Sequence, residues 1–485
     1  MTHGSAAPTP RRSRPEPGHL TRRAALLLLL ASAALVALAT PAGAHAFGGR
    51  KDLPLPAWLF FYGGAAAVIV SFTALGLLWP TSRLERPIVG WVLPRPVQAA
   101  APALAVAIRA VGLALLVGVF LTAAVGENSA DFNAAPRAVY VVFWVGMTVV
   151  SALVGNLWRL LSPFETIYAI ARWARGGTDG AGDEDETGEG RGGLPDVGYW
   201  PAAVLLFGFV FMELRVYDRA TEPRVLATAM VVYTVVVTAG TALWGRRFLR
   251  EGEPFAAFFG LLAHIAPLHR DDDGCLRLRP PLAGLPHLRR RPGLAAVILV
   301  ALGTTSYDGL TRTQFWQEIV AGQSRSDAML SNALGMAWMV AMVSILYVGA
   351  MRVTARITGA EPEDLVMTFV HTMVPIALAY AVAHYFSFLV FETNRFIGQL
   401  SDPLGRGWDL FGTAGWVDNL RILSPGTIAY VQAGSIVAGH IAGVLLAHDR
   451  AVARSRGRMA TRSQYPLLVA MVGYTVGGLA LLLSG

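Results

Sequence analysis

Histidines inside apolar runs are the first residues of this chain that suggest chemistry. His371 and His384 lie in "FVHTMVPIALAYAVAHYFSFLVFE", and His440 lies in "GHIAGVLLAHD". An ionisable side chain inside a membrane span costs several kcal/mol, so it is a candidate functional group by default. Each of these three imidazoles is therefore a candidate ligand or proton carrier.

The pair His371 and His440 suggests a cofactor site. The two residues are expected at similar depth on consecutive antiparallel helices, which is the arrangement that bis-histidine ligation of haem b requires. His384 is expected about 20 Å further along the first of these helices, toward the outer leaflet. Two alternatives stay open, namely imidazoles that hydrogen-bond a neighbouring helix and a pathway for protons or ions.

A copper site is a second metal hypothesis, and it involves the mature N-terminus. Cleavage of a leader after Ala44 would expose His45, whose amine and ring nitrogens chelate copper. His384 is the intramembrane histidine nearest to it by depth, so we expect it as a further ligand. The alternative is that signal peptidase tolerates a histidine at this position.

Acidic residues near the outer ends of the apolar runs are candidate contacts for an ion or a small-molecule ligand. They are Asp308, Glu392, Asp402 and Asp409. Asp-Gly and Asp-Pro pairs are also ordinary turn formers, which is the alternative for several of them. The sequence contains no GxSxG, P-loop, HExxH, CxxC or HxH motif at a usable position, so it identifies no catalytic residue.

The elements that position these residues are membrane helices. The chain is 54% hydrophobic and 15% charged, whereas soluble domains have about 25% charged residues. We predict an all-α polytopic integral membrane helix bundle in which about ten transmembrane helices follow a signal peptide. The predicted spans lie near residues 56–79, 103–125, 137–157, 198–214, 225–244, 292–306, 331–351, 365–391, 426–447 and 465–484.

Arginines alternate between successive loops, and this alternation predicts the orientation. Arginine-rich loops follow the first, third, fifth, seventh and ninth predicted spans, whereas the loops between them are mixed or acidic. By the positive-inside rule, the mature N-terminus and the C-terminus lie outside the cytoplasm of a multi-pass plasma-membrane protein. The net charge of +8 is thereby explained by topology, so we expect the lipid bilayer and no nucleic acid as partner.

Three segments outside the spans have separate interpretations. Residues 1–44 combine a basic leader, an apolar core and an Ala-x-Ala site, which predicts a signal peptide before a transmembrane domain at 45–485. The glycine-rich acidic residues 176–195 predict a disordered cytoplasmic linker. Residues 245–291 form a cytoplasmic loop in which "GEPFAAFFGLLAHIAPL" predicts an interfacial amphipathic helix.

Two segments of the sequence partly repeat each other. "NLWRLLSPFETIYAIARWA" and "ALWGRRFLREGEPFAAFFGLLAHIA" both contain Leu-Trp, then arginine, then Pro-Phe before an apolar run. Internal duplication is common in transporter folds. The alternative is that both segments share the chemistry of the membrane interface, where Trp and Arg are favoured.

Four stretches resemble a known family. They are "AHAFGGRKDLPLPAWLFFYGGAAAVIVSF", "LGTTSYDGLTRT", "PIALAYAVAHYFSFLVFE" and "AGHIAGVLLAHDRAV". From His45 to the end, the chain resembles actinobacterial polytopic membrane proteins that are often labelled fenitrothion hydrolase. The resemblance implies a plasma-membrane protein, and the label implies hydrolysis of an organophosphate triester.

Three functions follow as hypotheses from the sequence. The first is a histidine-based haem or copper site that serves redox chemistry or copper handling. The second is an ion- or proton-coupled transporter that uses the same histidines and the outer acids. The third is the organophosphate hydrolase that the family label implies, and it is the only one of the three in which the protein is a hydrolytic enzyme.

Overall fold

The apolar runs form helices of the length that a membrane span requires. A computed structural model describes residues 55–86, 90–174, 193–214, 219–271, 273–413, 415–416, 419, 421–455 and 457–483. Within these ranges, nine helices are long and apolar enough to cross a membrane. They are α2 (Ala57–Leu78), α3 (Arg95–Val125), the continuous α4–η2–α5 (Ala135–Val154), α9 (Pro223–Trp244), α11 (Leu294–Thr311), α13 (Arg325–Thr358), the continuous α14–η6–α15 (Pro362–Gln399), α16 (Pro425–Arg454) and the continuous α17–α18 (Arg458–Leu483).

Three of these spans are built from shorter pieces, and helices too short to span lie between the others. The pieces are α4 (Ala135–Arg137), η2 (Ala138–Gly146), α5 (Met147–Val154), α14 (Pro362–Phe369), η6 (Val370–Met373) and α15 (Val374–Gln399), with α17 (Arg458–Arg462) preceding α18 (Tyr465–Leu483). The short helices are α6 (Trp158–Leu161), α7 (Pro163–Ala174), α8 (Trp200–Glu213), η4 (Phe248–Gly252), α10 (Pro254–Ala263), η5 (Leu285–His287) and α12 (Gln314–Val320).

The prediction of an all-α membrane helix bundle is confirmed. The fourth predicted span falls on α8, which has 14 residues and is therefore about 21 Å long, shorter than a hydrocarbon core of about 30 Å. The sixth span runs on to Thr311, past the polar residues at which it was expected to end. It does so because the hydroxyls of Thr304, Thr305 and Ser306 donate to carbonyls one turn earlier, so these side chains remain satisfied inside a helix.

A small antiparallel sheet is the exception to the helical architecture. Its strands β1 (Trp91–Val92), β2 (Leu268–Arg270) and β3 (Leu276–Leu278) pair in the order β1-β3-β2. Leu278 lies opposite Trp91 on one side and Leu268 on the other. The sheet thus joins the loop before α3 to the loop after α10.

The long span of residues 362–399 is interrupted next to His371. Pro375 has no N–H, and its ring conflicts with the carbonyl four positions earlier, which is the carbonyl of His371. The chain passes this point through the tight turn η6, in which the N–H of Val374 bonds to the His371 carbonyl. The imidazole of His371 therefore lies in a proline-induced break of the helix.

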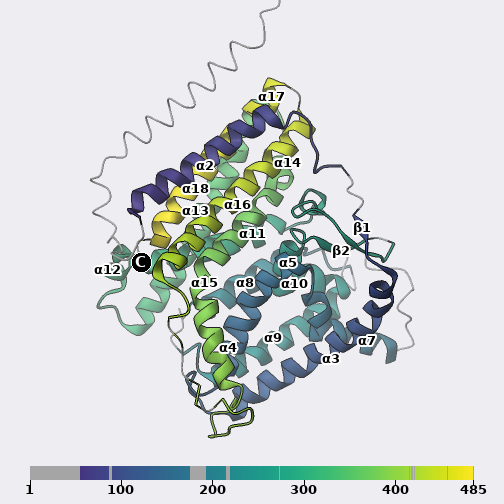
Figure 1. Cartoon of the computed structure of the whole chain (residues 1–485), viewed down its shortest axis with the longest axis vertical. Helices are drawn as coiled ribbons and strands as arrows, with labels where there is room; N and C mark the ends of the chain where they lie inside the picture. Colours follow the sequence, from purple (N-terminus) through teal and green to yellow (C-terminus); the bar gives the residue numbers. More distant parts are fainter. Residues whose placement is uncertain are drawn as a thin grey trace, which may run out of the picture. The chain divides into compact units, whose positions relative to one another are not determined.

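The described part of Phe47–Gly485 contains two groups of neighbouring helices with further helices between them. The helices α2, α16 and α18 are mutual neighbours, and α15 is in extensive contact with α16. The long helix α3 instead lies against α9, α6 and α7. Figure 1 shows α5, α8 and α10 between these two groups. The candidate site described below is formed by residues of α8, α11 and α15.

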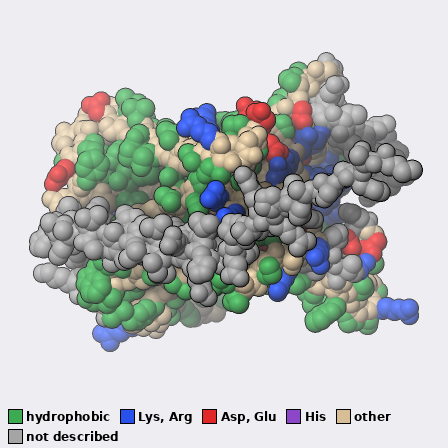
Figure 2. Space-filling model, turned by 90° about the horizontal axis from the view of Figure 1, so that it is seen from above, with side chains coloured by type: hydrophobic (Ala, Val, Ile, Leu, Met, Phe, Trp, Pro, Cys, Tyr) green, Lys and Arg blue, Asp and Glu red, His purple; other side chains and the backbone are tan. Residues whose placement is uncertain are grey.

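The outer surface of the bundle is largely apolar. Most apolar residues of α3 are exposed, and exposed leucines such as Leu77 and Leu78 end α2. On the face shown in Figure 2, hydrophobic side chains cover wide areas, and the charged side chains occur in separate groups. Such a surface is unfavourable in water and suits a lipid environment, as expected for a multi-pass membrane protein.

The helix expected at the cytoplasmic interface lies inside the molecule instead. Of the ten residues of α10, eight are buried, and the helix contacts α5, α8 and α6. Its aromatic residues explain this position, because the rings of Phe255, Phe258 and Phe259 pack against Trp144 and each other in edge-on, tilted and stacked arrangements. An interfacial helix would expose one polar face, whereas this segment is apolar on every side.

The two partly repeated segments contact each other reciprocally. The indole N–H of Trp158, from the first segment, donates to Glu253 of the second at 3.0 Å. In return, Arg246 of the second segment forms an ion pair with Glu165 of the first at 3.1 Å. The two contacts join different positions of the repeated pattern, so they show that the segments pack on each other and do not distinguish duplication from shared interface chemistry.

Two predicted segments fall outside the part of the chain that the structure describes. They are the signal peptide at 1–44 and most of the acidic linker, from 176 to 192. Both stay predictions from the sequence.

Candidate functional site

Asp308 and His384 form a buried carboxylate–imidazole pair between two membrane helices. The carboxylate of Asp308, on α11, is in contact with Nε2 of His384, on α15. Their side chains are only 15% and 5% exposed. An acid and an imidazole inside a span stabilise each other, because either one alone would be a desolvated polar group without a partner. The two candidate residues that the sequence assigned to separate sites are thus one site.

Arg312 covers this pair from the end of α11. Its guanidinium lies 3.8 Å from the Asp308 carboxylate and 3.4 Å from Nε2 of His384. It stands one helical turn after Asp308, on the same face of the chain. Because the Arg312 side chain is 54% exposed, the pair lies directly beneath a charged group that is accessible from outside the bundle.

A second acidic group lies on the other side of His384. The ring of His384 contacts the ring of Tyr385 edge-on, at 4.6 Å between centroids. The Tyr385 hydroxyl donates to Glu213, at the end of α8, at 2.9 Å. Three helices, α8, α11 and α15, therefore contribute a chain of polar side chains that runs from Arg312 to Glu213.

His371 and His440 are not joined by any direct contact. Nδ1 of His440 bonds to the Ile436 carbonyl of its own helix at 2.9 Å, and its ring packs against Tyr380 and Tyr474. His371 instead lies in the break before α15. Nε2 of each ring is buried without a hydrogen-bond partner in the described residues. The imidazoles thus occupy two separate environments.

Close packing of α15 and α16 leaves no space for a haem between them. A Cβ placed on Gly443 would lie 2.9 Å from the Thr372 carbonyl oxygen, and one on Gly439 would lie 2.8 Å from that of Pro375. The two helix backbones are therefore in contact at the depth of the histidines. A haem therefore does not lie between the backbones of α15 and α16 at these glycines, and the structure does not bring the two expected haem ligands into one shared environment.

The structure offers little to a metal ion elsewhere. Among the described residues, no three His, Cys, Asp or Glu side chains cluster so that they could hold a metal. His45 lies outside the described residues, and His384 is already engaged by Asp308. Of the two copper ligands expected from the sequence, His384 therefore has Asp308 as its partner in this structure.

The other outer acids have their own partners and do not join the pair. Glu392 forms ion pairs with Arg137 at 2.8 Å and with Arg395 at 2.9 Å. The carboxylate of Asp402 accepts the backbone N–H groups of residues 406 and 407, which is turn chemistry. Asp409 is exposed in the same loop. Of the four outer acids named from the sequence, only Asp308 lies beside an intramembrane histidine.

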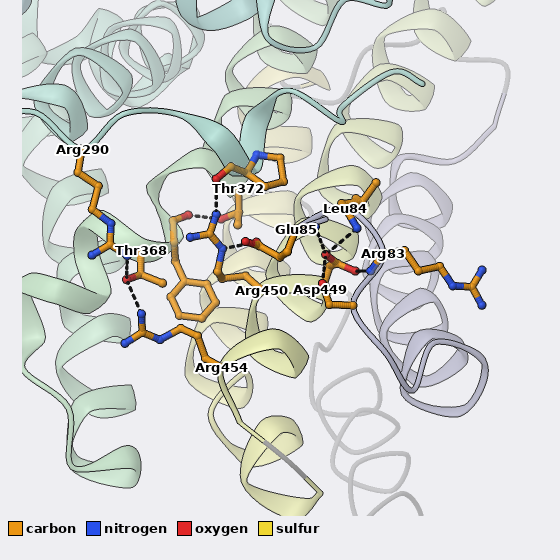
Figure 3. A network of polar contacts seen from close by, with 12 residues as sticks. Arg83, Leu84, Glu85, Arg290, Thr368, Thr372, Asp449, Arg450 and Arg454 are labelled. Carbon is orange, nitrogen blue, oxygen red and sulfur yellow. Dashed lines mark hydrogen bonds and ion pairs between the residues drawn. The ribbon is translucent and has the colours of Figure 1, made fainter. Parts of the chain in front are cut away.

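Asp449 anchors the loop that follows α2. Its fully buried carboxylate accepts five hydrogen bonds, at 2.7 to 3.2 Å, from the side chains of Trp79 and Ser82 and from the backbone N–H groups of Arg83, Leu84 and Glu85. Figure 3 shows the carboxylate pointing toward these backbone groups. A buried carboxylate with this many donors is fully compensated, so its role is structural.

The residues on both sides of Asp449 hold the same region. Nε2 of His448 bonds to the Trp79 carbonyl and Nδ1 to the Gln464 side-chain oxygen, each at 3.1 Å. Arg450 pairs with Glu85 and donates to the Pro286 carbonyl at 2.7 Å, as Figure 3 shows for Glu85. The segment His448–Arg450 is therefore a clamp on the loop that follows α2.

Sequence reasoning did not single out Arg312, Tyr385 or Glu213 as site residues. One signal was available, because Asp308 and Arg312 stand four residues apart and so share a helix face. Tyr385 adjoins His384 in the chain, but nothing local indicates that its hydroxyl reaches Glu213. That contact depends on how α8 is rotated against α15.

Comparison of the chain with protein-family models, with curated proteins and with solved structures finds no match.

Proposed function

We propose that this protein is a proton- or ion-coupled transporter of the cell membrane and that Asp308 and His384 together form its proton-binding site. The observation that carries the proposal is the buried contact between the Asp308 carboxylate and the His384 imidazole, formed between two different membrane helices. Intramembrane Asp, Glu and His side chains typically serve proton relays and ion pathways. A pair with contributions from two helices also allows protonation to change how those helices pack.

The surroundings of the pair support a pathway that is open on one side. Arg312 is half exposed above the pair. On the other side, Trp144 packs against Phe209 at 5.1 Å and Phe258 at 5.3 Å between ring centroids. A tight aromatic cluster of this kind works as a hydrophobic constriction. The arrangement is that of a carrier whose pathway is open on the side of Arg312 and closed on the side of α10.

The proposed orientation follows the arginine distribution. We propose that a leader at residues 1–44 is removed, that the mature N-terminus and the C-terminus lie outside the cytoplasm, and that Arg312 faces outward. Reporter fusions at Arg289 and at Asp409 test this orientation. Cytoplasmic reporter activity is expected at residue 289 and not at 409, and equal activity at both would overturn it.

The transport proposal is tested by charge movement in reconstituted membranes. Proteoliposomes on a solid-supported membrane receive a rapid pH jump, and the transient current is recorded. Wild-type protein is expected to give a current that Asp308→Asn and His384→Gln abolish. Glu392→Gln is the matched control, because Glu392 is on the same helix as His384 and pairs with Arg137 and Arg395. A current that survives both site variants would overturn the proposal.

A hydrolase is the second candidate, and the position of Arg312 favours it. His384 oriented by Asp308 has the arrangement of a general base, and Arg312 beside it would stabilise a developing negative charge on a phosphoryl oxygen. The family resemblance points to the same chemistry. Purified protein is then expected to hydrolyse an organophosphate triester in the presence of a chelator, and His384→Gln is expected to abolish this turnover. A wild-type rate equal to the buffer rate would exclude this candidate.

A further inference from the structure

A small, partly open cavity lies near the Asp308–His384 pair, between η2–α5, α8, α10, α11 and α15. Its volume of about 20 Å³ exceeds the roughly 10–15 Å³ that one water molecule needs. Part of its wall is π-helical, since η2 contributes Trp144 and Val145, and π-helical turns frequently occur at functional sites. The polar residues in the wall are Trp144, Thr148, Thr304, Thr305 and Tyr385.

Helix periodicity places this cavity beside the Asp308–His384 pair. On α11, Ala301 and Thr305 line the cavity, and Asp308 follows on the same face one turn later. On α15, Ala377 and Ala381 line it, and His384 follows one turn after Ala381. The cavity is therefore the next space inward from the pair along both helices.

The wall of the cavity presents one hydrogen-bond donor without a partner. Trp144 is only 6% exposed, and its indole N–H lies near the Tyr385 hydroxyl but forms no hydrogen bond of ordinary geometry with a described residue. An unsatisfied buried donor costs about 1–3 kcal/mol. Native proteins commonly satisfy such groups with an ordered water.

The remaining polar atoms of the wall are acceptors. The hydroxyls of Thr148, Thr304 and Thr305 each donate to a carbonyl four residues earlier, at 2.8 Å. The Tyr385 hydroxyl donates to Glu213. Because each of these oxygens has used its proton, each can only accept from a guest. A single water molecule can accept a hydrogen bond from the free N–H and donate its two protons to oxygens of the wall. The polar groups of the cavity therefore match one water.

We propose that this cavity is a binding site for one water molecule, which accepts a hydrogen bond from Trp144 and donates to the Tyr385 hydroxyl oxygen or to a threonine oxygen of the wall. The water lies beside the Tyr385 hydroxyl, which is bonded to Glu213, and one helical turn from the Asp308–His384 pair along α11 and α15. Its role as a proton relay rests on the proposed transport function, whereas the water site itself rests on the cavity and the Trp144 N–H.

The water site is tested by a structure of the full-length protein in nanodiscs at a resolution that shows ordered waters. A density peak is expected within about 3 Å of Trp144 Nε1. Trp144→Phe removes the donor and Ala381→Leu fills the space, so each is expected to remove the peak. Trp158→Phe is the matched control and is expected to keep it, because that indole is buried elsewhere and already bonded to Glu253.

Two results would overturn the water site. One is a wild-type cavity without a peak, and the other is a peak that persists in Ala381→Leu. A peak that persists in Trp144→Phe alone would overturn the assignment of Trp144 as the donor.

The relay is tested separately by the pH-jump current. Trp144→Phe and Ala381→Leu are expected to slow the charge movement several-fold and to leave its total amplitude unchanged, because the Asp308–His384 pair remains in place. Unchanged kinetics in both variants would overturn the relay. A wild-type protein that shows the water peak but no current would overturn the transport function and leave the water site standing.

Discussion

The backbone N–H of Arg83 donates a 2.7 Å hydrogen bond to the buried carboxylate of Asp449, which joins the loop after the first described span to the end of α16. Four more donors from the same loop converge on this carboxylate. A contact between such distant parts of the chain constrains both of them. The loop is held by the helix end, and the burial of Asp449 in turn depends on the loop.

Replacement of Asp449 by alanine is expected to destabilise the protein strongly. The change leaves several buried donors unsatisfied, and breaking such a network costs about 3 kcal/mol or more. The thermal midpoint of the purified protein in nanodiscs measures the effect. Asp402→Ala is the control, because its carboxylate binds two N–H groups in a loop at the surface, and it is expected to cost about 1 kcal/mol. Equal losses in both variants would contradict the clamp.

Two glycines of α16 are expected to respond differently to the same substitution. In Gly439→Ala, the new Cβ meets the Cβ of Ala379 at 2.2 Å, so the helices must separate at a cost of about 1–3 kcal/mol. Gly434→Ala places its Cβ in open space and is expected to be neutral or slightly stabilising, since alanine favours helix. Thermal midpoints of the two variants check this. Similar midpoints would show that α15 and α16 are not in backbone contact.

The buried carboxylate of Glu253 is expected to hold α10 in place. It caps the helix by accepting the N–H groups of Phe255 and Ala256 at 2.9 and 2.7 Å, and it also accepts from Trp158 and Tyr233. Glu253→Ala is therefore expected to cost about 2–4 kcal/mol, more than an ordinary cap.

Glu361 is the matched control for Glu253. It occupies the same capping position before α14 but makes no side-chain cap bond, so Glu361→Ala is expected to change stability little. Hydrogen–deuterium exchange of residues 254–263 locates the effect. Unchanged protection of α10 in Glu253→Ala would contradict this prediction.

The loop after α10 is expected to loosen in acid because of His264. Burial is the largest of the effects that lower the pKa of His264 from 6.5 to about 4, and the nearby Arg279 and His287 lower it further. A hydrogen bond to Gly260 opposes the shift. The unfolded loop therefore binds a proton at a higher pH than the folded loop. Its stability is fully present above about pH 6.5 and is lost as the pH falls toward 4.

Hydrogen–deuterium exchange of residues 264–288, corrected for the intrinsic pH dependence of exchange, measures this effect. Protection is expected to fall between pH 6.5 and pH 4 in the wild-type protein. His264→Gln removes the titrating group and is expected to flatten the dependence. An equally steep fall in the variant would assign the titration to another residue.

The sequence alone determined the helices of this protein and their membrane character. The length and the apolarity of a span are properties of a continuous stretch of residues, so α2, α9 and α18 could be placed within a few residues of their observed ends. Even the break at Pro375 follows from a local steric rule. The orientation of the bundle and the leader stay predictions, because they rest on arginine counts and on residues outside the described part.

Only the tertiary structure decided which polar residues meet. His371 and His440 have suitable positions along their helices, but closely packed glycines bring the backbones together and direct the two rings to different neighbours. Asp308 and His384 looked unrelated, yet the rotation of α11 against α15 makes them a pair. Side-chain encounters depend on the rotation and depth of each helix within the bundle. These are set by the packing of many distant residues at once, so no single stretch of sequence records them.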